Sequence, residues 1–223
     1  LGLAQLTWGN VSAIDCDAGL LYIKPSGIDL STISAAHVAC VDMHTGVQAG
    51  HGLQPSVDLP THMELYHAFR RARAVVHTHS KYATAFAQAG RPIVCAGTTH
   101  ADYFDGDIPV TAPVVPSTVP DYERQVGLAI VRHFYDNMID PDRVGGVLCC
   151  GHGVFTWGCD LKQAVERAHV IELVAEMAYI TRVLDVTHQH DQIPECALSI
   201  PVRTFHFNRK HGPSRYYGQL APA

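Results

Sequence analysis

Two histidines separated by a single threonine, His77 and His79, are the residues of this chain best suited to chemistry. They close an apolar run at positions 74–76. Side chains two positions apart in a β-strand point to the same face, so a strand here presents both imidazoles together, with Thr78 turned away. Two imidazoles at the end of a strand can hold a divalent metal ion, which brings Lewis-acid chemistry. The alternative is a pair of partly exposed loop histidines.

A third histidine and a carboxylate extend this hypothesis. His152 lies between two glycines after an apolar segment at 145–151, and Asp58 stands just before a helical pattern. Catalytic zinc takes three or four protein ligands and keeps one position open. We therefore expect a metal site of His77, His79 and His152 with Asp58. On local sequence alone, Asp58 is better explained as a helix N-cap and His152 as a loop histidine.

A second group of residues is suited to a small anion. Gly9-Asn10 and Ser26-Gly27 lie in turns, Lys24 is close to the second turn, and Ser56 could join them. Backbone N–H groups and hydroxyls bind phosphate oxygens, and lysine supplies a positive charge. Neither turn has the spacing of a P-loop or of a dinucleotide fingerprint, so a nucleotide is not indicated. Taken alone, the Pro25-Ser26-Gly27 segment is better explained as an ordinary turn.

A third group could transfer protons. Segment 98–104 places His100, Asp102 and Tyr103 between apolar flanks, and Tyr217 lies near the end of the sequence. A carboxylate or tyrosine beside a metal can act as acid or base. Tyrosines near a terminus more often only pack.

Hydrophobic periodicity indicates the elements that must position these residues. Short strands come first and helices alternate irregularly, which favours an α/β layered domain with a mixed or largely antiparallel sheet. The predicted strands are 6–14, 20–24, 37–43, 74–79, 93–95, 145–151 and 154–157. The predicted helices are 60–70, 81–89, 121–137 and 161–184, and a polar, aromatic and basic tail follows at 204–211.

Composition excludes several classes of protein. The 16 Lys and Arg residues are scattered among 21 Asp and Glu, which argues against nucleic-acid and anionic-membrane partners. No apolar stretch approaches the roughly 20 residues of a membrane span. Seven irregularly spaced cysteines are typical of a reduced, cytoplasmic protein. No linker or repeat divides the chain, so residues 1–223 are expected to form one domain.

Taken together, the ordered motifs resemble the class II aldolase/adducin-like family over residues 6–219. The matching segments are Thr7-Trp8-Gly9-Asn10-Val11-Ser12, Lys24-Pro25-Ser26-Gly27, Asp58-Leu59-Pro60-Thr61-His62, Val76-His77-Thr78-His79-Ser80, Thr99-His100-Ala101-Asp102-Tyr103-Phe104, Gly151-His152-Gly153 with Trp157-Gly158, and Lys210-His211-Gly212 with Tyr216-Tyr217-Gly218-Gln219. The resemblance implies a three-layer α/β/α domain and a homotetramer with sites at subunit interfaces. It also implies a helix ahead of residue 6, which we expect to be missing from this chain.

The resemblance assigns roles to residues at matching positions. It implies zinc, or manganese or another divalent ion in its place, held by His77, His79 and His152, with Asp58 as ligand or close neighbour. Asp102 and Tyr217 are implied as catalytic acid and base. Val57 stands where the family pattern has a second serine, although its backbone N–H could still donate. The implied substrate-binding residues are Gly9, Asn10, Lys24, Ser26, Gly27, Ser56, Val57, Glu123 and His206.

The implied activity is that of the family's epimerases, which interconvert L-ribulose 5-phosphate and D-xylulose 5-phosphate. The C3–C4 bond breaks in a retro-aldol step, the aldehyde rotates, and the bond forms again on its other face. The main alternative is a class II aldolase of the L-fuculose-phosphate type. Such aldolases carry glutamate in place of Asp58 and lack segment 99–104. An adducin-like binding module is a further alternative, and it would be expected to have lost the metal histidines.

Overall fold

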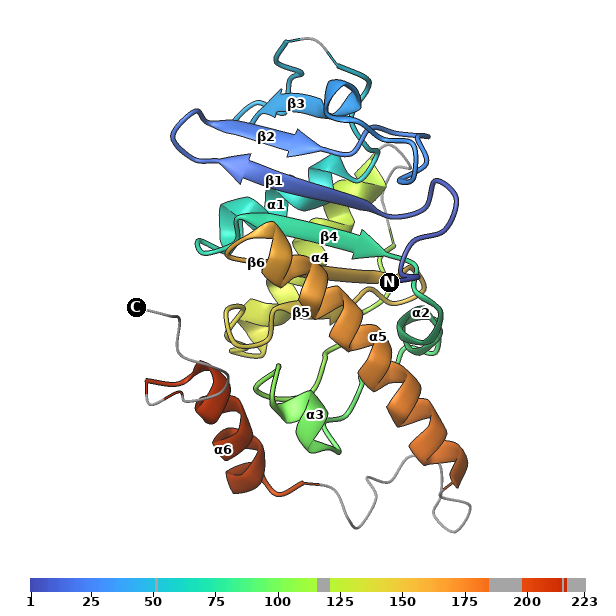
Figure 1. Cartoon of the computed structure of the whole chain (residues 1–223), viewed down its shortest axis with the longest axis vertical. Helices are drawn as coiled ribbons and strands as arrows, with labels where there is room; N and C mark the ends of the chain where they lie inside the picture. Colours follow the sequence, from blue (N-terminus) through green and yellow to red (C-terminus); the bar gives the residue numbers. More distant parts are fainter. Residues whose placement is uncertain (51, 116–120, 185–197, 214, 216–223) are drawn as a thin grey trace, which may run out of the picture.

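The strands of this protein form one six-stranded sheet in the order β3-β2-β1-β4-β6-β5 (Figure 1). The computed structural model describes residues 1–50, 52–115, 121–184, 198–213 and 215. All neighbouring strands are antiparallel, and an isolated parallel bridge joins Val110 to Leu148. The prediction of a largely antiparallel sheet is confirmed. The strands are β1 (Asn10–Asp15), β2 (Leu20–Ile23), β3 (Ala39–Asp42), β4 (Ala74–Thr78), β5 (Gly146–Leu148) and β6 (Val154–Gly158).

Helices cover both faces of the sheet and complete the expected three layers. Along β4, Val75 packs with α1 (Leu59–Ala68) and α4 (Tyr122–Asp136) on one face. Its neighbours Ala74 and Val76 face α5 (Leu161–Leu184) on the other side, where α2 (Lys81–Gln88) also packs. Strand β4 is therefore buried on both faces, which explains the unbroken apolar run at its first three positions.

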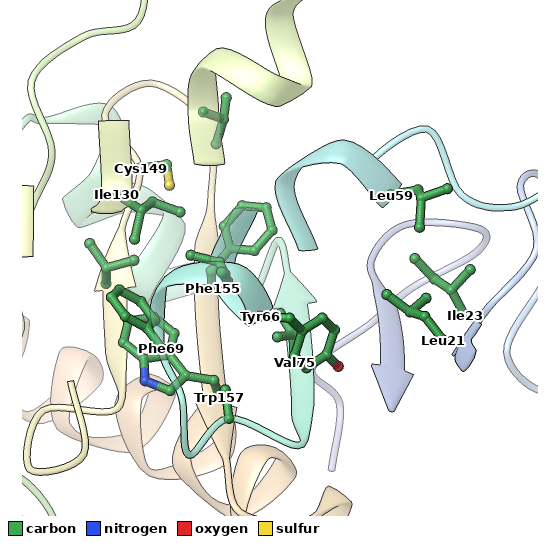
Figure 2. Close-up of a cluster of buried hydrophobic side chains, with 14 of the residues drawn as sticks. Leu21, Ile23, Leu59, Tyr66, Phe69, Val75, Ile130, Cys149, Phe155 and Trp157 are labelled. Carbon is green, nitrogen blue, oxygen red and sulfur yellow. The ribbon is translucent and has the colours of Figure 1, made fainter. Parts of the chain in front are cut away.

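Aromatic side chains fix α1 and α4 against β6. The ring of Trp157 lies 4.7 Å from that of Phe69 and 5.2 Å from that of Phe134, measured between centroids. The Trp157 indole N–H donates to the carbonyl of Pro141 at 2.8 Å, so its polar atom is also satisfied. Figure 2 shows Phe69 and Trp157 side by side in this cluster. Helix α1, which follows Asp58, and helix α4 thus belong to one packed layer.

The four predicted helices are present within one or two residues of their expected ends. The strands differ more. Strand β1 begins at Asn10 instead of residue 6, because Gly9 takes a left-handed φ of +75° and carries the preceding residues out of the sheet. Segment 93–95 is not a strand and makes one isolated bridge, from Ile93 to Ile108.

Among the described residues, two α-helices and a short 3-10 helix (Ala35–His37) had no counterpart in the predicted elements. The polar tail forms α6 (Ile200–His211), and α3 (Thr98–Ala101) lies in the segment that carries Asp102. Phe207 is the buried residue of α6, so its sequence has no apolar stripe of helical period to reveal it. No helix in the described ranges combines the length and apolar composition that a membrane span requires.

Candidate active site

The three predicted metal histidines meet at one end of the sheet. Strand β4 ends at Thr78, which pairs with Val154 at the start of β6, and His152 lies in the turn between β5 and β6. This pairing brings the end of one strand against the turn before another. The ligand atoms of His77, His79 and His152 all lie within 4.8 Å of one another. The sequence predicted a strand over 145–151 that ends next to His152. Strand β5 is shorter, and His152 lies in the turn that follows it.

The hydrogen bonds of His77 leave a lone pair available for a metal. Its Nδ1 donates to the carbonyl oxygen of Val154 at 2.9 Å, because that oxygen can only accept. In the neutral ring, Nε2 then carries the lone pair, and it lies 2.9 Å from Nε2 of His79. Two nitrogens bound tetrahedrally to one zinc ion would be about 3.3 Å apart. The pair thus fits a shared ion with a small adjustment.

Lowered pKa values favour the neutral, metal-binding form of all three imidazoles. Desolvation lowers the pKa of His77 well below its ordinary value, and repulsion from the protonated forms of His152 and His79 would lower it further. Desolvation also lowers the pKa of His79 and of His152, while the negative charge of Asp58 opposes both shifts. Neutral imidazoles need not release a proton before they bind a metal ion.

Gly153 allows the histidines to come this close. A Cβ at this position would lie 2.7 Å from the carbonyl oxygen of Thr78 and 3.1 Å from Cε1 of His77. Any side chain would push the turn that carries His152 away from β4. The glycine after His152 is thus explained by close packing, as the flanking glycines in the sequence indicated.

Asp58 lies at the N-cap position of α1, but its carboxylate makes no capping hydrogen bond. The Asn10 amide donates to Asp58 Oδ2 at 2.6 Å, and Asn10 is paired with His77 across β1 and β4. Asp58 is 8% exposed and lies outside the tight cluster of three histidines. Its charge acts on His79 and His152, so it is a close neighbour of the cluster.

A pocket of about 410 Å³ joins the histidines to the predicted anion-binding turns. It contains every predicted substrate-binding residue except His206. Ser56 accepts a hydrogen bond from the Asn10 amide at 3.0 Å, and Val57 is 64% exposed. The lining residues are Thr7, Trp8, Gly9, Asn10, Lys24, Ser26, Gly27, Ser56, Val57, Asp58, His77, His79, Tyr122, Glu123 and His152.

Lys24 brings a buried positive charge to the edge of this pocket. Its side chain is 3% exposed, and Nζ donates to the carbonyls of Thr7 and Pro25, both at 3.3 Å. Burial lowers the pKa of Lys24, and the charge of Asp29 opposes this shift. Neutral carbonyls satisfy the ammonium group without cancelling its charge, which leaves an attraction for an anion in the adjacent turns.

Asp102 and His206 are brought together, but away from the pocket of their own chain. Asp102 Oδ1 lies 2.9 Å from His206 Nδ1, and Arg209 Nη2 donates to both carboxylate oxygens at 3.2 Å. Both partners come from α6, which packs beside α3 far from the end of β4 (Figure 1). Tyr217 lies outside the described residues.

Tyr122 is a pocket residue that the sequence did not single out. It is the first residue of α4, and its ring centroid lies 6.0 Å from that of His152. Burial raises the pKa of Tyr122, with smaller contributions from Cys149, Glu123 and Asp58. Its only sequence signal is its position next to the predicted residue Glu123.

Residues 1–179 match the family described as Class II Aldolase and Adducin N-terminal domain. The chain belongs to this family. The three histidines, Asp58 and the lining of the pocket all lie within the matched range. This membership and the histidine cluster together support a divalent-metal site in a class II aldolase fold.

Solved structures agree with the assignment of a class II aldolase fold. An L-fuculose 1-phosphate aldolase has a TM-score of 0.72 and 21% identity, covering 91% of this chain and 87% of its own. YgbL from Klebsiella pneumoniae has a TM-score of 0.68 and 24% identity, covering 92% and 89%. An L-fuculose 1-phosphate aldolase from Glaciozyma antarctica PI12 has a TM-score of 0.70 and 15% identity, covering 93% and 74%. At these identities the likeness establishes the fold alone.

Proposed function

We propose that this protein is a zinc-dependent epimerase that interconverts L-ribulose 5-phosphate and D-xylulose 5-phosphate by cleaving and re-forming the C3–C4 bond. The observation that carries the proposal is the carboxylate of Asp102, which Arg209 and His206 hold in place. In the family resemblance, the segment around Asp102 belongs to the epimerases and is absent from aldolases of the L-fuculose-phosphate type. The aspartate at position 58, where those aldolases have glutamate, supports the same choice.

The pocket accommodates the two ends of a phosphorylated ketopentose. The turns of Ser26-Gly27 and Ser56 supply hydroxyl and backbone donors for the phosphate, with the charge of Lys24 beside them. The histidine cluster lies in the same pocket and receives the carbonyl end. A divalent ion held by the three histidines would supply a Lewis acid for the negative charge that develops when C3–C4 breaks.

Inversion at C4 requires proton transfer on two faces of the aldehyde, so two proton carriers are needed. We assign them to Asp102 and Tyr217. Two hydrogen bonds from Arg209 orient the carboxylate of Asp102, which is assigned to remove the C4 hydroxyl proton. Because Asp102 lies outside the pocket of its own chain, we propose that it acts in the pocket of a neighbouring subunit of a homotetramer. The same proposal applies to Tyr217.

A class II sugar-phosphate aldolase is the second candidate function. It is favoured by the pocket of a single chain, which already combines the histidine cluster, the anion turns and Glu123. Bond cleavage with release of the aldehyde requires no rotation and no second proton carrier. On this interpretation Asp102 would have a structural role at the junction of α3 and α6.

Incubation of the purified protein with L-ribulose 5-phosphate and zinc separates the two functions. We expect D-xylulose 5-phosphate to accumulate, and metal-stripped protein to be inactive until zinc is restored. Free dihydroxyacetone and glycolaldehyde phosphate without the epimer would instead support the aldolase. Full activity of the metal-stripped protein would refute a zinc-dependent mechanism for both the epimerase and the aldolase.

A further inference from the structure

Tyr122 places a phenol at the histidine end of the pocket, on the chain that carries the histidines. Its ring lies 6.0 Å from that of His152 with an interplanar angle of 49°, and the side chain lines the pocket with His77 and His79. It is partly exposed there and also packs against the main hydrophobic cluster. The side chain of Tyr122 is thus in contact with the hydrophobic core and also lines the space available to a ligand.

The position of Tyr122 is fixed by the contact between α4 and α1. The Thr61 hydroxyl on α1 donates to the carbonyl oxygen of Glu123, next to Tyr122. Gly127 lets the two helices approach closely, since a Cβ there would lie 2.8 Å from Cβ of Glu64. Helix α1 begins directly after Asp58, so the same helix fixes both Asp58 and Tyr122 relative to the histidines. This is the pre-organisation that a substrate-contacting residue needs.

The phenol hydroxyl of Tyr122 makes no hydrogen bond within the described part of the chain. The hydroxyls of two other tyrosines have partners within the protein. The hydroxyl of Tyr66 lies 2.7 Å from Ser12 Oγ, and that of Tyr103 donates to Glu166 Oε1 at 3.1 Å. A tyrosine hydroxyl in a partly buried site usually has a partner. The partner of Tyr122 is therefore expected to come from whatever occupies the pocket.

Three other polar side chains of this pocket are acceptors or already donate within the protein. Asp58 is an acceptor, the Asn10 amide donates to both Ser56 and Asp58, and Lys24 Nζ donates to two carbonyls. A neutral phenol is a donor at pH 7 by its ordinary pKa of about 10. An oxygen that gains negative charge during the reaction is stabilised by such a donor.

We propose that Tyr122 is a further substrate-contacting residue, whose hydroxyl donates a hydrogen bond to the ligand oxygen at the histidine end of the pocket. This inference rests on the proposed metal-dependent sugar-phosphate chemistry. It applies equally to the epimerase and to the aldolase, because in both proposed functions the ketose carbonyl binds at the histidine cluster. It also gives each pocket a hydroxyl donor from its own chain, in addition to the Tyr217 expected from a neighbour.

The test compares Tyr122→Phe with Tyr135→Phe, a control on the same helix whose side chain is 83% exposed. The probe is acetohydroxamate, whose two oxygens chelate zinc as a ketose carbonyl and hydroxyl would. Its dissociation constant is measured by calorimetry on zinc-loaded protein. We expect about tenfold weaker binding to Tyr122→Phe, as for one lost hydrogen bond, with zinc content unchanged and no effect in Tyr135→Phe.

Inorganic phosphate provides an internal control, because it would bind at the Ser26 end of the pocket. Selective loss of hydroxamate affinity with unchanged phosphate affinity supports the inference. Hydroxamate affinity within twofold of the unaltered protein would overturn it, and so would equal weakening of both probes. If the unaltered protein fails to convert L-ribulose 5-phosphate while the selective loss is still seen, the proposed substrate is wrong and the role of Tyr122 stands.

Discussion

At the level of single residues, the site depends on which protonation states burial permits. Desolvation favours neutral His77, His79 and His152, while the Asn10 amide keeps the Asp58 carboxylate close to them. The sequence indicated the histidine pair through its spacing of two and His152 through its flanking glycines. The Asn10–Asp58 bond could not be predicted, because it joins residues 48 positions apart. Nor could the position of Tyr122, which depends on how α4 packs on α1.

Loss of one histidine should weaken metal binding without unfolding the protein. We expect His79→Asn to bind zinc at least 10–100-fold more weakly, which is roughly the effect of losing even an outer partner of a metal ligand. His79 is the most exposed of the three, so its replacement leaves the core intact. Zinc affinity from chelator competition is the measurement, with the exposed His44→Asn as the control. Equal affinities in the two variants would rule out His79 as a ligand.

At the level of elements, antiparallel pairing brings the site together. Strands β4 and β6 place the histidines at one end of the sheet, and α1 begins at the same end with Asp58. The predicted strands and helices were sufficient to place His77, His79 and Asp58 at or next to element ends, whereas His152 lies in the turn between β5 and β6. The order of the strands was not predictable, since it is decided by pairings between distant segments. Helix α6 was missed because polar contacts with Asp102 and Asp107 hold it in place instead of an apolar stripe.

Substitution of Gly153 tests whether β4 and the turn that carries His152 must lie this close together. In Gly153→Ala the new Cβ would lie 2.7 Å from the Thr78 carbonyl oxygen, so β4 and the His152 turn must separate. We expect a loss of about 1–3 kcal/mol of stability and weaker zinc binding. Urea unfolding and chelator competition measure the two effects. Gly97→Ala is the matched control, because nothing lies within 4 Å of its added Cβ. A Gly153 variant as stable and as zinc-competent as this control would show that the close approach is not needed.

At the level of the whole molecule, buried neutral histidines outside the metal cluster make stability depend on pH. Burial lowers the pKa of His62 to about 3 and that of His100 to about 4. His62 has no exposed surface and lies against Ser12, with Nδ1 2.7 Å from Oγ. An unfolded histidine titrates near 6.5. Below that pH the unfolded chain binds protons that these folded residues cannot, so acid favours unfolding.

We therefore expect the free energy of unfolding to fall as pH drops from 6.5 to about 4, by about 1.4 kcal/mol per pH unit for each such histidine. His62→Gln should reduce this slope by the contribution of one histidine, about 1.4 kcal/mol per pH unit. The variant is expected to be less stable overall. Urea unfolding at several pH values, with a chelator present, measures both slopes. Identical slopes would mean that His62 is protonated in the folded protein.

The arrangement of subunits decides whether Asp102 can act in catalysis. Because Asp102 lies outside the pocket of its own chain, its proposed role requires a neighbouring chain to complete each site. His79→Asn and Asp102→Asn should each be inactive alone. In a random one-to-one hybrid, about a quarter of the pockets would combine an intact His79 with an intact Asp102 from the neighbour. Co-expression with two different tags isolates these hybrids, and we expect about a quarter of the full turnover.

The matched control pairs His79→Asn with Asp58→Asn. Both residues lie in the pocket of one chain, so no hybrid of these two variants contains an intact site and no activity should return. If the hybrid with Asp102→Asn is equally inactive, Asp102 does not act across an interface. The aspartate would then serve only to hold α6 against α3 through Arg209 and His206, and the aldolase interpretation would be preferred. Recovery in the first hybrid but not in the control requires two chains per site, which follows from the epimerase proposal and not from a self-contained pocket.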